Sequence, residues 1–468
     1  MDILKCIPTA GLEFGTKKKE MKIHILHYHL HPGGVARVIE SQIESLRAQF
    51  PHTQLQVVTG YCPDKATLEK QGVTVIENPK LNYLFEEDLD DVDVNYLFHS
   101  LLGFLYYHIG KDDVLHAHNL NLGKNPVLTY AVSYLAQRGL KMINHCHDFA
   151  EDRPNNWKFL KDIIEVHFNE PLKGVLYPTL ENYRFAVLNS YDLKRISSYH
   201  LPEEHIHYLP NPIQQVVVPE VKEREEAKEK LCNELHLDPG KRIVTYPVRV
   251  IRRKNIGELI LLSVLFEDQF HWLVTLPPKN PQEMRDYEKW QNFAAKYDLP
   301  IHFEVGTKVD FPTLMKGSDF CITTSVREGF GMAFMEPWMY GTPVIGRRLP
   351  YVVDDFISLG FHFPNLYDTL LVEDRNEVKD FKDIIAEEQM SFIKQMIKGD
   401  VDKTDIFQRN PHLDHLMDPN EPAIVEANIK RVKQHYSLEQ YGKKLGSIYR
   451  QLSEFPGTDA GATNKSST

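Results

Sequence analysis

Short apolar runs alternate with stretches of helical spacing along this chain, and the alternation starts twice. The first series is KIHILHYH (22–29), QLQVVTG (54–60), DVLHAHN (113–119), LKMINHCH (140–147), YRFAVLNS (183–190) and IHYLPNPI (206–213). The second series is RIVTYPV (242–248), HWLVTLP (271–277), IHFEVG (301–306), DFCITTS (319–325) and TPVIG (342–346). Strands that alternate with helices form parallel sheets, whose ligands bind at the carboxyl ends of the strands. The sequence therefore predicts two similar α/β domains.

The second series begins after the charged, helix-prone run PEVKEREEAKEKL (219–231), which indicates a domain boundary near residue 216. The polar stretch 385–425 is interpreted as an irregular helical insertion. The segment 436–452 has apolar residues at helical spacing. We therefore expect an N-terminal extension (1–20), a first domain (21–215), a second domain (216–435), a final helix (436–453) that can pack back on the first domain, and a disordered tail (456–468).

Composition limits the partners of the protein. The 468 residues include 54 Lys and Arg against 65 Asp and Glu, a formal charge of -11, without a long basic run. We therefore expect no nucleic-acid partner. No apolar run approaches the roughly 20 residues of a membrane span, so the sequence predicts no transmembrane segment. The five cysteines form no CxxC pair, which is typical of a reducing, cytoplasmic compartment.

Two glutamates flank a glycine turn in the stretch REGFGMAFMEPWMYGTPVIGR (327–347). Glu328 follows a predicted strand, and Gly329 and Gly331 permit a positive φ and close approach of a ligand to the backbone. A helix that begins after Gly331 would offer free N–H groups to a diphosphate. Glu336 lies past this turn, so both carboxylates can face one crevice and accept hydrogen bonds from hydroxyls. The alternatives are the acid and base of a hydrolase, or two surface charges.

A basic pair follows the first strand of the second half. Arg249 and Lys254 lie five residues apart in YPVRVIRRKNIGELI (246–260), on a loop that leads into a helix. Arginine can bind a diphosphate leaving group by a fork, and lysine can bind it as a point charge. Because Arg252 and Arg253 lie between them, the register is ambiguous, and a solvated basic surface is the alternative.

A glycine turn also lies between the first strand and the first helix, at Gly33 and Gly34 of HLHPGGVARVI (29–39). Glycines at this place let a ligand approach the backbone, although the alternative is a tight turn without a ligand.

Histidines recur at strand ends, in the pairs His116 and His118, and His145 and His147. Alternate residues of a strand point to the same side, so each pair can chelate a metal, and a metal-dependent hydrolase is one candidate function. No HExxH motif or other spaced ligand set accompanies these histidines. The sequence therefore predicts no metal site.

The glutamate motif resembles the nucleotide-sugar signature of retaining glycosyltransferases of family four. The resemblance rests on Glu328-Gly329-Phe330-Gly331, on the seven residues between the glutamates, and on the Gly-Thr-Pro-Val that follows. It extends from about residue 22 to residue 452 and implies the GT-B fold, in which two Rossmann-like domains face each other across a cleft. One departure is Pro337, where the family usually has alanine after the second glutamate; proline inside a helix removes a hydrogen bond.

The resemblance also implies roles for individual residues. Glu328 and His147 would contact the transferred sugar, and Glu336 the ribose of the nucleotide. Arg249 and Lys254 would stabilise the diphosphate as it leaves. The remaining donor-binding positions are Gly33, Gly34, Asp148, Gly329, Phe330, Gly331, Met332 and Ala333.

These roles predict a retaining, metal-independent hexosyltransferase without a cofactor. Its co-substrate would be a nucleoside-diphosphate sugar, UDP- or GDP-linked, and its acceptor a small molecule or glycan bound by the first domain. Two alternatives remain at this point: a glycosidase or phosphorylase that uses Glu328 and Glu336 directly, and a sugar-nucleotide-binding module without turnover.

Overall fold

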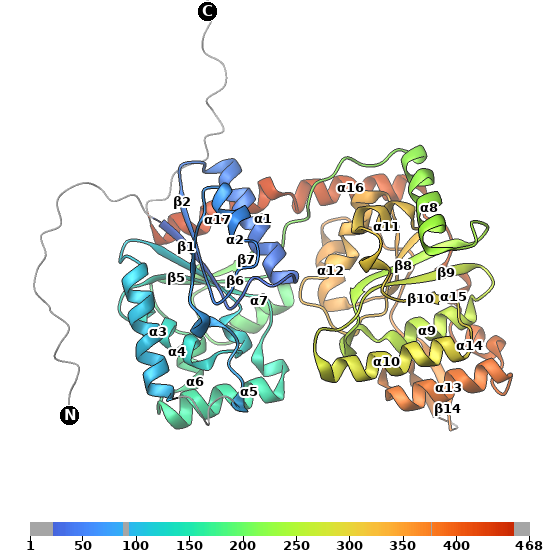
Figure 1. The fold of residues 1–468 in the computed structure, drawn as a ribbon, viewed down its shortest axis with the longest axis horizontal. Helices are drawn as coiled ribbons and strands as arrows, with labels where there is room; N and C mark the ends of the chain where they lie inside the picture. The colour runs from blue at the N-terminus through green and yellow to red at the C-terminus, as the bar shows by residue number, and fades with distance from the viewer. Residues whose placement is uncertain (1–21, 88–92, 376, 454–468) are drawn as a thin grey trace, which may run out of the picture.

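A computed structural model describes residues 22–87, 93–375 and 377–453 of the protein. The predicted extension (1–20) and the predicted disordered tail (456–468) lie outside these residues. Two α/β lobes lie side by side, the N-terminal lobe in blue to green and the C-terminal lobe mainly in yellow and orange (Figure 1). Among the described residues, no helix combines the length and the apolar character needed to cross a membrane.

The first lobe is built on a parallel sheet of seven strands in the order β3-β2-β1-β4-β5-β6-β7. The strands are β1 (Lys22–His27), β2 (Gln54–Thr59), β3 (Thr74–Glu77), β4 (Val114–His118), β5 (Lys141–Cys146), β6 (Tyr183–Val187) and β7 (Ile206–Tyr208). The strand order reverses between β1 and β4, and crevices beyond the carboxyl ends of strands at such a point are ligand sites.

Helices cover both faces of this sheet, which explains why its strands are nearly continuous apolar runs. On one face, Ile39, Ile43 and Leu46 recur at helical spacing in α1 and are buried against the strands. The helices of the lobe are α1 (Gly34–Gln49), α2 (Lys65–Lys70), α3 (Val94–His108), α4 (Pro126–Ala136), α5 (Pro154–Lys161), α6 (Leu172–Leu176) and α7 (Ser190–Ser197).

The second lobe is also built on a parallel sheet, with six strands in the order β10-β9-β8-β11-β12-β13. They are β8 (Arg242–Arg249), β9 (Phe270–Leu276), β10 (Ile301–His302), β11 (Phe320–Thr323), β12 (Val344–Arg347) and β13 (Leu366–Tyr367); β14 (Leu371–Asp374) and β15 (Glu377–Asp380) form a separate antiparallel pair. The strand order reverses between β8 and β11. The basic loop follows β8 and the glutamate motif follows β11, so both lie at the switch point of this sheet.

The helices of the second lobe also cover both faces of its sheet. They are α8 (Val221–Leu235), α9 (Ile256–Leu265), α10 (Pro281–Lys296), α11 (Phe311–Gly317), α12 (Pro350–Ser358), α13 (Ala386–Lys398), α14 (Lys403–Arg409), α15 (Leu413–Leu416) and α16 (Pro422–His435). The stretch interpreted as an irregular insertion is helical and belongs to the core of the lobe: Phe392, Ile393 and Met396 of α13 are buried in it.

The chain returns to the first lobe at its end. Helix α16 packs on the second lobe through Val432, and α17 (Leu438–Leu452) packs on α1 of the first lobe, where Ser45 donates to the carbonyl of Leu438 (2.5 Å). Figure 1 shows the two helices in red along the same side of the molecule. The boundary predicted near residue 216 lies in the segment between β7 and α8.

The helix predicted after Gly331 is wrong. The chain instead forms two short 3₁₀ turns, η10 (Met332–Phe334) and η11 (Glu336–Tyr340). Pro337 occupies the start of the second turn, where its missing N–H costs nothing; inside a continuous helix its ring would clash with the carbonyl four residues earlier. The turn therefore offers individual backbone N–H groups rather than the N-terminus of an α-helix.

Candidate active site

Glu328 is held by two cations of the basic loop. Lys254 Nζ contacts Glu328 Oε1, and Arg253 donates to Glu328 Oε2 (3.0 Å). Burial alone would raise the pKa of Glu328, but the charges of Lys254 and Arg253 outweigh it and lower the pKa. Burial lowers the pKa of Lys254 in spite of its carboxylate partner. The Glu328 carboxylate is therefore ionised and fixed, which suits an acceptor of hydrogen bonds.

Arg249 forms no ion pair or hydrogen bond with this carboxylate in the structure. It ends β8, and its guanidinium donates to the carbonyl of Pro277 (2.6 Å). Of the predicted pair, only Lys254 contacts Glu328, and Arg253 is the second cation there. In the sequence Arg253 only makes the register of the basic pair ambiguous; the signal that could have identified it is its position directly before Lys254.

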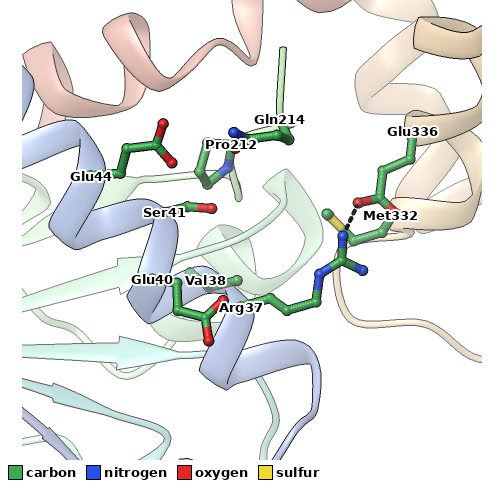
Figure 2. Close-up of a pocket in the computed structure, with 9 residues that line it drawn as sticks. All are labelled: Arg37, Val38, Glu40, Ser41, Glu44, Pro212, Gln214, Met332 and Glu336. Carbon is green, nitrogen blue, oxygen red and sulfur yellow. Dashed lines mark hydrogen bonds and ion pairs between the residues drawn. The ribbon is translucent and has the colours of Figure 1, made fainter. Parts of the chain in front are cut away.

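Glu336 is buried between the lobes and pairs with Arg37 of α1 (2.9 Å). Burial raises the pKa of Glu336, and Arg37 only partly offsets this effect. The two residues border a cavity of 260 Å³ between α1, the segment that joins the lobes, and the turn at Met332. Figure 2 shows Arg37 reaching from α1 to the carboxylate of Glu336. Arg37 was not identified from the sequence, because it is an isolated basic residue one turn into its helix.

The glycine turn fits tightly into its surroundings. Gly331 has φ +85°, and a Cβ there would lie 2.6 Å from a methyl carbon of Val352, so both conformation and packing require glycine. The ring of Phe330 is buried in the core of the second lobe, which leaves only its backbone for a ligand. Met332 and Ala333 are half-buried.

The glycine turn also touches the other lobe. A Cβ on Gly329 would lie 3.1 Å from the carbonyl oxygen of His147, and Asn189 donates to the carbonyl of Gly329 (3.0 Å). The structure therefore brings the His147 end of β5 against the glutamate motif.

Gly33 and Gly34 are exposed at the start of α1. Nothing lies within 4 Å of the position that a Cβ would take at Gly34, so the turn is open on that side. Lys279 of the second lobe donates to the carbonyl of Pro32 (3.2 Å), immediately before the glycines. The turn thus borders the interface of the lobes, and its contact with a diphosphate remains a prediction.

A hydrogen-bond chain fixes the orientation of His147. Gln42 Oε1 accepts from His118 Nε2 (2.8 Å), and His118 Nδ1 pairs with His147 Nε2 (2.9 Å). Burial lowers the pKa of both histidines far below the usual value, so both rings are neutral. A neutral imidazole has one donor and one acceptor nitrogen. His147 therefore donates through Nε2 to His118 and keeps Nδ1 as its acceptor.

Asp148 continues the same strand end. Asn119 Oδ1 accepts from the backbone N–H groups of His147 (3.1 Å) and Asp148 (2.8 Å), which fixes the turn. The carboxylate of Asp148 accepts from Arg153 (2.7 Å). Neither Asn119 nor Arg153 was singled out from the sequence.

Three histidines lie close enough together to hold an ion. The ligand atoms of His116, His118 and His145 are within 4.8 Å of one another. Several of these nitrogens already have partners: His116 Nε2 pairs with His145 Nδ1 (3.3 Å), and His116 Nδ1 with the Tyr449 hydroxyl (2.9 Å). His145 Nε2 has no hydrogen-bond partner among the described residues, and metal independence remains a prediction that a chelator tests.

The comparisons with known proteins define the class of protein: a glycosyltransferase with the GT-B fold. Residues 227–387 match the family described as glycosyl transferases group 1, and the match includes both glutamates and the basic loop. The predicted resemblance to this family, the fold class and the glycosyltransferase activity are confirmed, whereas retention of the anomeric configuration stays a prediction.

Two curated relatives are synthases from Petrotoga mobilis. The chain is 29% identical over 403 residues to a mannosylglucosyl-3-phosphoglycerate synthase, covering 81% of this chain and 77% of the relative. It is 24% identical over 332 residues to a mannosylglucosylglycerate synthase, covering 60% of this chain and 71% of the relative. Among solved structures, Anabaena HepE in complex with UDP-glucose matches with a TM-score of 0.59 at 14% identity, over 92% of this chain and 99% of that chain.

Proposed function

We propose that the protein transfers a hexose from a UDP- or GDP-linked sugar to an acceptor hydroxyl, with retention of the anomeric configuration. One observation carries the proposal: the Glu328 carboxylate is held between Lys254 and Arg253, on a turn that lies against His147 of the other lobe. Glu328 accepts hydrogen bonds from hydroxyls of the transferred sugar. The cations beside it stabilise the charge that develops on the departing diphosphate.

The mechanism assigns the other residues to binding and orientation. Glu336 binds the ribose, and the backbone from Gly331 to Ala333 binds the sugar and phosphates. Arg249 and the turn at Gly33-Gly34 face the diphosphate, and His147 contacts a sugar hydroxyl. Both oxygens of Glu328 are engaged by cations, which makes it a poor nucleophile and a poor general acid. The acceptor hydroxyl therefore attacks on the face that the diphosphate leaves, and the departing phosphate takes its proton.

The names of the two relatives support an acceptor of a particular kind. Both relatives are synthases of a mannosylglucosyl unit on a glycerate, with or without a 3-phosphate. We propose a small glycoside of glycerate as the acceptor and the cytoplasm as the place of reaction. Four free, buried cysteines among the described residues are compatible with a reducing compartment.

The first test is a transfer assay with anomeric detection. Purified protein with GDP-mannose or UDP-glucose and a glucosylglycerate, with or without a 3-phosphate, is expected to give a product that keeps the anomeric configuration of the donor. Proton NMR of the new anomeric signal measures this outcome. An inverted signal would disprove retention. Hydrolysis of a glycoside without a nucleotide sugar would instead support the glycosidase alternative. Nucleotide binding without turnover would support the sugar-nucleotide-binding module.

A second prediction concerns metal ions. Excess chelator is expected to leave the turnover number unchanged, because Lys254 and the other basic residues supply the counter-charge of the diphosphate. Elemental analysis of the chelated protein serves as the control, since His116, His118 and His145 lie close enough together to retain an ion. Complete loss of transfer that manganese restores would contradict metal independence.

A further inference from the structure

Lys124 is a half-buried lysine without a carboxylate partner among the residues that the structure describes. Its Nζ lies 5.8 Å from the centre of the Tyr83 ring, and no ion pair or hydrogen bond to another described residue engages it. Burial of an unpaired ammonium group is unfavourable, so such a group is normally found with an anion.

The backbone fixes the place of this lysine. Lys124 follows Gly123, whose φ of +72° ends the 3₁₀ turn after β4, and its carbonyl accepts from Leu84 N–H (2.8 Å). The next residue, Asn125, caps α4 and also donates to the carbonyl of Asn82 (2.8 Å). Lys124 therefore stands in the loop after β4, at the switch point of the first sheet, where a ligand is expected.

A second cation, Arg153, precedes α5, whose first turn packs on the loop of Lys124: Asn156 donates to the carbonyl of Leu122 (2.8 Å). Burial lowers the pKa of Lys124, and the positive charge of Arg153 lowers this pKa further. Arg153 pairs with Asp148 (2.7 Å), with its side chain 41% exposed. Of these two cations only Arg153 has a carboxylate partner among the described residues, so the group keeps a positive charge that an incoming anion can neutralise.

The group adjoins the proposed sugar site. Asp148 directly follows His147, whose carbonyl lies against the turn of Glu328. Burial would lower the pKa of Arg253, but the charges of Glu328 and Asp148 raise it. Asp148 thus pairs with Arg153 of the first lobe, and its charge also acts on Arg253 of the second lobe.

We propose that Lys124 and Arg153 form an anion-binding subsite for the acceptor, which holds a carboxylate or phosphate while a hydroxyl of the same molecule faces the donor sugar. The assignment of the bound molecule as the acceptor rests on the proposed function, whereas the anion site itself does not. An anion there would supply the missing partner of Lys124 and use the free donors of the Arg153 fork.

The test measures binding apart from turnover. Ligand-observed NMR titrations of the full chain use 3-phosphoglycerate, glycerate, glycerol 3-phosphate and glycerol as probes. We expect the anionic probes to bind and glycerol not to bind. Lys124→Met should weaken the anionic probes by about tenfold or more, the usual effect of losing a charge-assisted hydrogen bond. Comparison of glycerate with glycerol 3-phosphate shows which anion the subsite prefers.

Lys173→Met is the matched control, because Lys173 Nζ lies 5.7 Å from the ring of Tyr199 in the same lobe but is exposed. We expect Lys173→Met to bind the probes with the same affinity as the unmodified protein. We also expect both variants to have the melting temperature of the unmodified protein. Equal binding of glycerol and the anions, or unchanged anion binding in Lys124→Met, would overturn the subsite.

Transfer assays on the same variants separate the two proposals. With an anionic acceptor, Lys124→Met should raise KM by about tenfold and change kcat little, whereas KM for a neutral glucoside should not change. Anion binding that depends on Lys124 without any transfer would retain the subsite and reject the proposed function. Transfer to neutral and anionic acceptors with equal KM would retain the proposed function and reject the anion-binding subsite.

Discussion

Replacement of Lys254 by methionine is expected to lower the turnover number of transfer by about 10²–10³-fold, the usual cost of one preorganised electrostatic donor. Lys254 is 9% exposed and contacts Glu328, so its charge acts in a partly dehydrated site. Methionine keeps most of the side-chain length but leaves Arg253 as the only cation on a buried carboxylate. The variant therefore loses both the charge beside the diphosphate and the orientation of the sugar anchor.

Arg252→Met is the matched control for this measurement. Arg252 lies in the same loop but its side chain is exposed, and its backbone N–H donates to Glu283 (2.9 Å). We expect this variant to behave like the unmodified protein in steady-state kinetics. If Lys254→Met were equally mild, the basic loop would be a solvated surface. A glycosyl adduct on Glu328, detected by mass spectrometry, would replace the proposed mechanism by a covalent one.

Arg249→Gln completes this series. The proposed mechanism requires Arg249 to leave the carbonyl of Pro277 and bind the diphosphate, so its replacement should lower turnover by a factor comparable to that of Lys254→Met. If Arg249→Gln were mild and Arg253→Gln severe, Arg253 would fill the role that the sequence assigns to Arg249.

The parallel sheets were predictable because their signal is local. β1 and β6 are buried on both faces and therefore read as short apolar runs between turn residues. The predicted strand 301–306 was too long, since β10 ends at His302 and Glu304 adopts a left-handed conformation with φ 61°. The edge strands β3 and β13 are short and were not predicted.

Pairings between distant segments could not be predicted in this way. Arg37 and Glu336 are 299 residues apart and belong to different lobes, so their contact depends on how the lobes meet. The pairing of Lys254 with Glu328 spans 74 residues and arises because β8 and β11 are neighbours at the switch point. The sequence placed both residues at strand ends, but the choice between Arg249 and Arg253 as the second cation required the loop geometry.

Glu336→Gln is expected to weaken binding of UDP or GDP, whichever the protein uses, whereas Glu328→Gln should leave this affinity nearly unchanged and still impair transfer. The expected loss for Glu336→Gln is about 10–150-fold in Kd, corresponding to about 1.5–3 kcal/mol for hydrogen bonds to a charged group. The reason is that the ribose diol is present in the free nucleotide, whereas the group that Glu328 binds belongs to the transferred sugar. Isothermal titration with the nucleoside diphosphate alone measures both variants.

Arg37→Gln is the control for the Glu336 measurement, because Arg37 occupies this carboxylate in the structure and its side chain is 57% exposed. A ribose that binds Glu336 must displace Arg37 or share the carboxylate with it. Loss of the arginine is therefore expected to leave nucleotide affinity equal or higher. If Arg37→Gln and Glu336→Gln instead lost nucleotide affinity equally, the ion pair itself would form the site. Equal losses in the two glutamate variants would reject the division between ribose and sugar anchors. If only Glu328→Gln lost nucleotide affinity, the two roles would be exchanged, and the cavity beside Glu336 would have another ligand.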